Sequence, residues 1–218
     1  MPAVSQLRRD LAELAALANI DLGLLFRQVD TPEAAREALY DLLPALVDTY
    51  GVAAGSVAAD WYDETRDELE VAGAFRALTA EPDVTDLDIT ARWGIGPLFQ
   101  AVPAWDDAQT LLAGSMQRRI SNVARLTVSD SSIADPRADG WQRSASGGCT
   151  FCQMLASRGA VYSKSSVDFA SHDHCSCVAV PAFRGRARPV RPYTPSERNS
   201  TDAEQELAEE YLASHDAG

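Results

Sequence analysis

The sequence that decides the fold of the C-terminal third of this chain comes in two pieces, Cys149-Thr-Phe-Cys152 and Ser171-His172-Asp173-His174-Cys175-Ser176-Cys177. All four cysteines of the chain and two of its three histidines lie in these pieces. Zinc is held in proteins by four sulfur or imidazole ligands arranged as a tetrahedron, and a Cys-x-x-Cys turn supplies two of them. The pattern therefore predicts a structural zinc site, formed by Cys149 and Cys152 with two of His172, His174, Cys175 and Cys177.

Other uses of the cysteines fit this pattern less well. Disulfides belong to oxidising compartments, whereas the N-terminus is a charged helical segment without the apolar stretch of a signal peptide. A thioredoxin-like redox pair needs only a Cys-x-x-Cys at a helix start, which leaves the downstream cluster unexplained. Free buried thiols are the remaining alternative.

The cluster also lacks the features of a catalytic zinc site. An ion with four protein ligands has no open position for a catalytic water, and residues 140–196 contain no glutamate to act as a general base. Zincin and zinc-deaminase patterns are absent, and a His-Asn-His nuclease would need a second Cys-x-x-Cys with completing Asn and His residues. No serine sits in a Gly-x-Ser-x-Gly elbow, so a Ser-His protease has little to build on. The sequence alone therefore identifies no catalytic residues.

The net charge of −13 is distributed unevenly along the chain. Residues 1–110 hold 7 Arg and 20 Asp or Glu, whereas residues 111–198 hold 12 basic and 6 acidic groups. Such a separation favours docking between charged surfaces over general nucleic-acid binding, which needs a broadly basic domain. No apolar run approaches the roughly 20 residues of a membrane span. We therefore expect neither a membrane partner nor a small-molecule substrate.

The first half of the chain has the apolar periodicity of helices. Residues 7–18 carry one apolar stripe, and Thr31-Pro32-Glu33 supplies the capping hydroxyl, the proline and the acid that start a second helix. Pro44 is expected to kink or restart that helix, and a further helix is expected over about Val52 to Val71. Thr79–Asp88 should be a loop.

The helical pattern resumes over Leu87–Ala101 and again from Trp105 to about Val128, which should be the longest helix. Its exposed turns are expected to carry three arginines: Arg118, Arg119 and Arg125. Turn-forming residues replace the pattern from Ser129 onward. Two β-prone runs, Ala160–Tyr162 and Val178–Phe183, flank the predicted metal ligands.

These observations predict a mainly α protein with three regions. A helical body spans residues 1–130, and a small zinc-stapled α/β module spans 131–183. A module this short needs a staple because its own core is small. Residues 184–218 form a basic arm with an acidic tail, and prolines make the arm extended. Four arginines define the arm: Arg184, Arg186, Arg188 and Arg191.

The C-terminal motifs occur in the order Trp141, Cys149-x-x-Cys152, Gly159-Ala-Val-Tyr162 and His172-x-x-Cys175-x-Cys177. This order resembles the C-terminal signature of MuF-like phage minor head proteins. The stretches Ala58–Tyr62 and Ala91–Phe99 are similar to versions of that family from actinobacterial phages and prophages. The likeness extends over about residues 5–185, which is nearly the whole predicted folded part.

The resemblance implies a virion or procapsid protein, made in the bacterial cytoplasm and associated with the portal or the major capsid protein. It also implies that His172, Cys175 and Cys177, in preference to His174, join the Cys-x-x-Cys turn as zinc ligands. Relatives are often labelled capsid maturation protease, which is the alternative function, although the residues show no convincing catalytic set. We expect the arm of Arg184–Arg191 to contact an acidic surface or packaged DNA, with an affinity that falls as salt rises.

Overall fold

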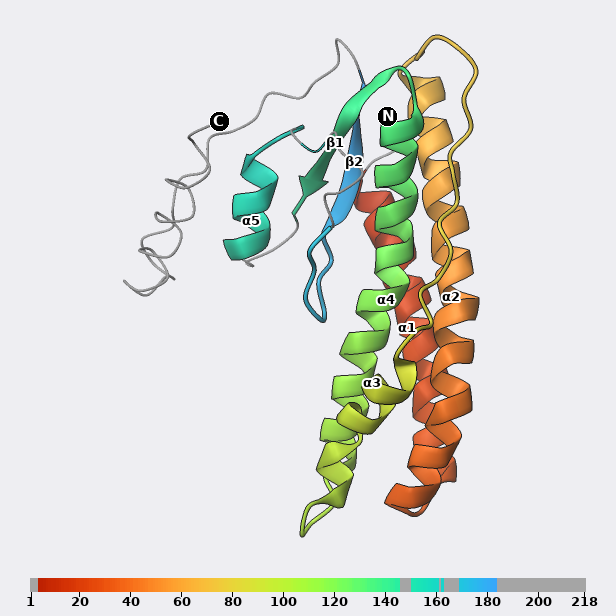
Figure 1. Ribbon diagram of the computed structural model, residues 1–218, viewed down its shortest axis with the longest axis vertical. Coiled ribbons are helices and arrows are strands. Elements are labelled where there is room, and N and C mark those ends of the chain that lie inside the picture. The colour runs from red at the N-terminus through yellow and green to blue at the C-terminus, as the bar shows by residue number, and fades with distance from the viewer. Residues whose placement is uncertain (1–3, 146–149, 161, 163–168, 184–218) are drawn as a thin grey trace, which may run out of the picture.

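Three long helices lie side by side and form the body of the molecule: α1 (Val4–Gln28), α2 (Pro32–Glu68) and α4 (Trp105–Ala134) (Figure 1). The short helix α3 (Leu87–Gly94) and the 3-10 turn η1 (Gly96–Phe99) pack against this bundle near one end. The structure is a computed structural model, and it describes residues 4–145, 150–160, 162 and 169–183.

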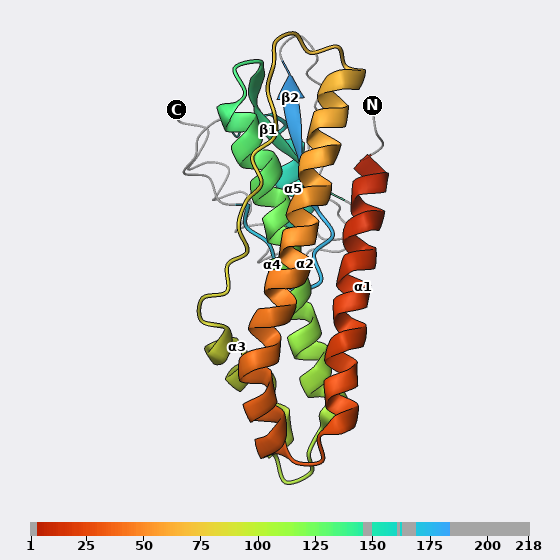
Figure 2. The ribbon, with the colours of Figure 1, turned by 90° about the vertical axis from the view of Figure 1, so that its right-hand side faces the viewer.

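A two-stranded antiparallel sheet lies against α4 toward the other end of the bundle (Figure 2). Its strands are β1 (Ala138–Ser144) and β2 (Val178–Phe183), and α5 (Thr150–Ser157) packs on β1. The prediction of a mainly α protein with a small C-terminal α/β part is confirmed. The strand β1 was not expected from the sequence, and of the run Ala160–Tyr162 the structure describes one bridge, between Tyr162 and Trp141.

The helix α2 begins as its sequence predicts and then continues further than expected. The Thr31 hydroxyl accepts a hydrogen bond from the backbone N–H of Ala34 at 3.2 Å, and Pro32 occupies the first turn. The prediction that the helix restarts at Pro44 is wrong, because α2 runs through it to Glu68 as the longest helix of the described chain. Buried leucines on both sides of Pro44, Leu43 and Leu46 among them, pack into the bundle, and this packing outweighs the hydrogen bond that proline removes.

The helix α4 extends past Ser129 to Ala134, so the prediction of turns at Ser129–Ser132 is also wrong. The side chains of these serines are satisfied within the helix: Ser132 Oγ donates to the carbonyl of Val128 at 2.6 Å, and Ser129 Oγ to that of Leu126 at 3.1 Å. Serine favours turns because it bonds to nearby backbone, but such back-bonding to a carbonyl one turn earlier is compatible with a buried helix. The helix therefore ends later than expected, and the turn begins at Asp135 and Pro136.

An extended strap, residues 70–86, descends along the bundle from the end of α2 to the start of α3 (Figure 1). Its backbone is fastened to α4: Leu78 N donates to Ser131 Oγ at 2.8 Å and Ala80 N to Thr127 Oγ1 at 3.0 Å. Gly51 of α2 permits the close approach, since a Cβ there would lie 2.9 Å from Pro82 Cγ. The predicted loop at Thr79–Asp88 is confirmed as far as Asp86.

One stretch of α2 is long and apolar enough to cross a membrane by length and composition alone. In the structure the apolar side of this helix is occupied by α1 and α4, which pack along it. A helix in a bundle needs an apolar side to pack against its neighbours, and 39% of the apolar stretch of α2 is buried in this way. The bundle thus accounts for the composition of α2.

The C-terminal part shares one hydrophobic core with the helices. Buried residues from Leu7 to Phe183 form a single cluster, which includes Trp141, Cys152 and Cys175. All six residues of β2 are buried. The module therefore completes its interior with the surface of α4, in addition to any stabilisation by a metal.

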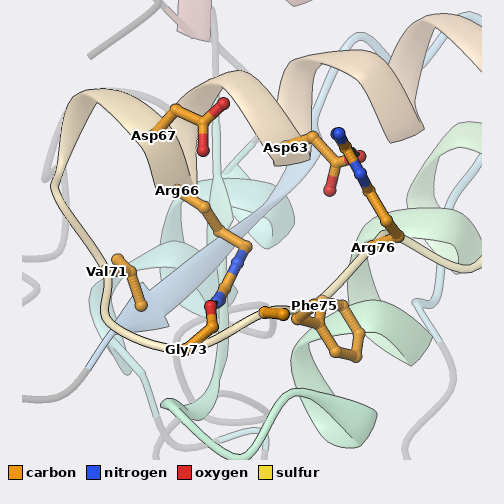
Figure 3. A pocket seen from close by; sticks show the side chains of 8 residues that line it. Asp63, Arg66, Asp67, Val71, Gly73, Phe75 and Arg76 are labelled. Atoms are coloured by element: carbon orange, nitrogen blue, oxygen red, sulfur yellow. Dashed lines mark hydrogen bonds and ion pairs between the residues drawn. The ribbon is translucent and has the colours of Figure 1, made fainter.

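A buried ion pair fixes the end of α2 to the end of α4. Arg66 donates through Nη1 to Asp135 Oδ2, which also accepts the Tyr62 hydroxyl at 3.2 Å, and the Arg66 and Asp135 side chains are 5% and 0% exposed. The other Arg66 nitrogen donates to the carbonyl of Gly73 at 2.8 Å and so holds the start of the strap (Figure 3). Burial, reinforced by the charge of Asp135, raises the pKa of Tyr62.

Replacing Asp135 by alanine is expected to lower the free energy of unfolding by about 3–5 kcal/mol, because the Arg66 guanidinium would remain buried without its partner. The matched control is Arg76→Ala, which removes the ion pair with Asp63 from a side chain that is 84% exposed. Exposed pairs contribute about 0–1 kcal/mol. Urea unfolding followed by circular dichroism measures both variants, and equal effects would contradict this assignment.

Candidate metal centre

Three predicted ligands converge between α5 and the loop that precedes β2. Cys152 comes from the first turn of α5, and His172 and Cys175 come from that loop. Their ligand atoms all lie within 4.8 Å of one another. Both cysteines are buried while His172 is exposed, so the group opens to solvent only on the imidazole side.

The distances between these atoms fit the edges of a zinc tetrahedron. Zn–S bonds of about 2.3 Å and Zn–N bonds of about 2.0 Å at tetrahedral angles place sulfurs about 3.8 Å apart and sulfur about 3.6 Å from nitrogen. Cys152 Sγ lies 3.7 Å from Cys175 Sγ and 3.8 Å from His172 Nε2. No disulfide joins the described cysteines Cys152, Cys175 and Cys177, and a 3.7 Å separation is far longer than the roughly 2.05 Å of a disulfide bond. The donor set therefore fits zinc.

The imidazole of His172 is held in the orientation that a metal ligand needs. Its Nδ1 lies 2.7 Å from the backbone carbonyl of Asp173. A carbonyl only accepts, so Nδ1 carries the proton and Nε2 presents its lone pair toward Cys152. Metal-binding histidines commonly use their second nitrogen in this way, because the hydrogen bond fixes both the tautomer and the ring.

The ligand loop is fastened to one face of α4. Arg118 pairs with Asp173 at 2.7 Å, and Asn122 accepts the Ser171 hydroxyl at 2.9 Å. These contacts come from residues four apart, which share a helix face. One turn earlier on the same face, Gly114 leaves room for His174, whose Nε2 would lie 2.6 Å from a Cβ at that position.

Arg125 completes this face and holds the loop by its backbone. It donates through Nε to the carbonyl of Cys177 at 2.9 Å and through Nη2 to the carbonyl of Cys175 at 2.7 Å. The prediction that Arg125 is exposed is wrong, since 1% of it is accessible. Burial lowers the pKa of Arg125 to about 10, and the nearby charges of Cys175 and Cys177 oppose this shift. Arg125 therefore keeps its proton at neutral pH.

Two further arginines surround the sulfurs. Arg143 of β1, 4% exposed, donates through Nη1 to Cys152 Sγ at 3.7 Å, and its guanidinium lies 3.8 Å from the ring centre of Phe169. Arg8 of α1 donates to the carbonyl and hydroxyl of Ser144, next to Arg143. Three cations from three elements lie near one small group of thiols, and a zinc ion with three thiolates carries the net negative charge that they would balance.

The thiols of Cys175 and Cys177 form a coupled pair. A hydrogen bond from Cys177, assisted by the charge of Arg125, lowers the pKa of Cys175 to about 4. The same hydrogen bond, together with burial, raises the pKa of Cys177. The lowered pKa of Cys175 is in the direction of the thiolate, which is the form that binds zinc.

The other predicted ligands are placed as follows. Cys177 is buried beside Cys175, at the start of β2, and lies outside the three-residue group. Cys149 lies outside the described residues, one position before the start of α5. His174 stands against Gly114 with a left-handed φ of 59°. Cys149 and Cys177 thus remain the two candidates for the fourth ligand.

Sequence reasoning missed the residues that support the ligands. Phe169 stacks on Trp141, with ring centres 5.5 Å apart, and Arg143 covers the Phe169 ring. A sequence signal for the arginines was present: Gly114, Arg118 and Asn122 recur every four residues along α4, and Arg125 continues the row. A polar row of this kind on a helix indicates a face that packs against polar groups of another segment.

Comparison with known families gives one match. The VG15 protein family matches residues 2–202 of the chain, which includes the helical bundle and every candidate ligand. The chain belongs to the VG15 protein family. Its membership of this family of viral genes supports a phage-encoded protein, as the sequence resemblance implied. Comparison with curated proteins and with solved structures gives no match.

We expect this VG15-family protein to purify with about one zinc ion per chain. Cys152→Ser and Cys175→Ser should each remove it, because each deletes one sulfur of the converging group. Metal analysis of Cys149→Ser and Cys177→Ser then identifies the fourth ligand, since one should lose zinc and the other retain it. Retention of zinc in both Cys152→Ser and Cys175→Ser would exclude this site.

Arg125→Lys should weaken both zinc retention and stability, by about 2–3 kcal/mol in the free energy of unfolding. A lysine keeps the charge but cannot donate to two carbonyls through a planar fork. Arg119→Lys on the same helix is the control, because Arg119 contacts the strap and α3 and not the ligand loop: it makes a 3.8 Å ion pair and a carbonyl contact at Asp83 and a 3.4 Å hydrogen bond to Thr90. Thermal unfolding and competition with a chromogenic zinc chelator measure the two effects. Equal behaviour of the two variants would show that Arg125 does not hold the ligand loop.

Proposed function

We propose that this phage protein is a minor structural protein of the head, associated with the portal or procapsid, in which a structural zinc clasps the C-terminal module onto a helical body. The observation that carries the proposal is the small amount of space beside the buried sulfurs. The space beside Cys175 and Cys177, lined also by Arg8 and Arg125, measures about 30 Å³. This volume accommodates about one water molecule and no polypeptide substrate.

A larger cavity, of about 240 Å³, lies at the end of α2 beside the strap (Figure 3). Its lining contains no serine, cysteine or histidine. Its charged groups also serve the fold: Arg66 holds Asp135 and Gly73, while Asp63 accepts from Arg76 and from the backbone of Ala77. The residues around this cavity attach the strap to α2, and the lining offers no serine or cysteine nucleophile for proteolysis.

Capsid maturation protease is the alternative function, and it requires a nucleophile, a base and an open cleft. Among the described residues, His172 is directed at Cys152, and its Nδ1 is used by a carbonyl. The serines of α4 at 129 and 132 donate to helix carbonyls. These engagements favour the structural function over the proteolytic one.

A head protein also fits the charges. The helical body carries the net negative charge of residues 1–110, whereas the predicted arm after Phe183 is basic. In the proposed function this arm, Arg184–Arg191, contacts packaged DNA or an acidic surface of the portal or major capsid protein. The arm lies outside the described residues, so this part rests on the sequence.

The test is complementation of a phage or prophage that lacks this gene. We expect the wild-type protein in purified virions or procapsids, quantified by mass spectrometry, and reduced incorporation when Arg184, Arg186, Arg188 and Arg191 are replaced by glutamate. The matched control exchanges the same four residues for lysine, which keeps the charge.

Absence of the wild-type protein from heads at every assembly stage would contradict the structural function. Capsid or scaffold proteins that are trimmed only when this protein is co-expressed, with trimming lost in Cys or Ser variants, would establish the protease instead.

A further inference from the structure

The helix α3 buries its small residues and exposes its large ones. Leu87, Ala91 and Gly94 are buried, and Gly94 fits so closely that a Cβ there would lie 2.5 Å from Leu112 of α4. On the opposite face, Ile89 is 58% exposed and Trp93 is 53% exposed. These two lie four residues apart, one above the other on the helix. If packing against α4 were the only role of α3, its tryptophan would be expected on the buried face.

The exposed apolar surface continues beyond α3. Phe99 of η1 is 49% exposed and Val102 in the following loop is 80% exposed. The backbone hydrogen bond from Ala104 to Pro97, at 3.1 Å, folds this loop back on η1. We name Ile89, Trp93, Phe99 and Val102 the tip patch. Among the described residues, a third of the exposed large apolar side chains lie in this one 14-residue stretch. The tip patch is therefore a local concentration of exposed apolar side chains, whereas single ones are common on protein surfaces.

The tip patch lies at the acidic end of the bundle. The α1–α2 turn and the start of α4 come to the same end as η1 (Figure 1; Figure 2), and Arg36 of α2 stands 5.8 Å from the ring centre of Phe99. Residues 27–37 and 86–107 together contain seven acidic residues and three arginines. Asp88 and Asp106, on either side of the patch in sequence, are both exposed.

Charge decides which occupant suits this surface. A second copy of the chain would bring two acidic rims together, and like charges across an interface are unfavourable. A bilayer with anionic lipid would be repelled for the same reason. A different protein with an apolar pocket and a rim of lysine or arginine matches both features, since tryptophan in an apolar pocket is a typical hot spot and opposite rim charges speed association.

We propose that the tip patch is the docking surface through which this protein binds a basic-rimmed apolar pocket on another protein of the phage head, with Trp93 as the buried anchor. This inference rests on the proposed head function and names the surface that performs it. The metal ligands and the residues of the tip patch lie in different segments of the chain, so the two sites are separable by mutation.

The test compares Ile89→Glu and Trp93→Ala with Ile20→Glu in the complementation assay. Ile20 is the matched control, because it is a helical isoleucine with 57% exposure on α1. We expect the tip-patch variants to be incorporated into heads at least ~10-fold less than wild type, and Ile20→Glu to be incorporated normally. Circular dichroism and zinc content should be unchanged in all three.

A second variant tests the charged rim. Asp88→Lys with Asp106→Lys should also reduce incorporation, and 0.5 M salt should release more wild-type protein from opened heads than 0.1 M salt, because screening weakens rim pairs. If a tip-patch variant misfolds, this pair and the salt series still decide the question.

The outcomes are distinguishable from failure of the proposed function. Wild-type protein absent from heads overturns both proposals. Normal incorporation of Trp93→Ala and Ile89→Glu, with wild type present, overturns only the tip patch. A dimer in solution that Trp93→Ala dissociates, or Trp93-dependent co-sedimentation with phosphatidylcholine vesicles, would overturn the assigned partner.

Discussion

The fork of hydrogen bonds from Arg125 to the carbonyls of Cys175 and Cys177 is the contact on which the C-terminal third depends. It fixes the backbone of two sulfur-bearing residues to the central part of α4, and the register of β2 follows directly from it. Because the guanidinium is buried, no water competes for these carbonyls. The metal ligands are thus positioned by the helical bundle before any ion is considered.

The proposed zinc and the hydrophobic core then act on the same segment from two sides. The sulfurs hold α5 to the ligand loop, while the fully buried strand β2 pairs with β1 and packs against α4. Neither contribution is independent of the other, since Cys152 and Cys175 are themselves members of the core cluster. A small module gains stability here by sharing the interior of a larger neighbour as well as by a staple.

Local patterns in the sequence predicted those features whose causes are local. The cap at Thr31, the helical class and the gathering of Cys152, His172 and Cys175 all follow from short spacings. Pro44 and the serines of α4 were misread, because burial against other helices overrides local preferences that hold for isolated segments. Arg143 was missed because its partners are Cys152 of α5 and the carbonyl of Ala170, and β1 was missed because it pairs with β2; no single-sequence pattern links such distant positions.

The placement of β2 has a consequence for synthesis of the chain. The strand that covers α4 and carries the carbonyl of Cys177 ends at Phe183, so it leaves the ribosome after every helix of the bundle. Until then Arg118 and Arg125 of α4 and the buried side of β1 are exposed to water, and the metal ligands cannot come together. Nascent chains therefore pass through a stage with a finished bundle and an open flank, during which chaperones and free metal have access to the thiols.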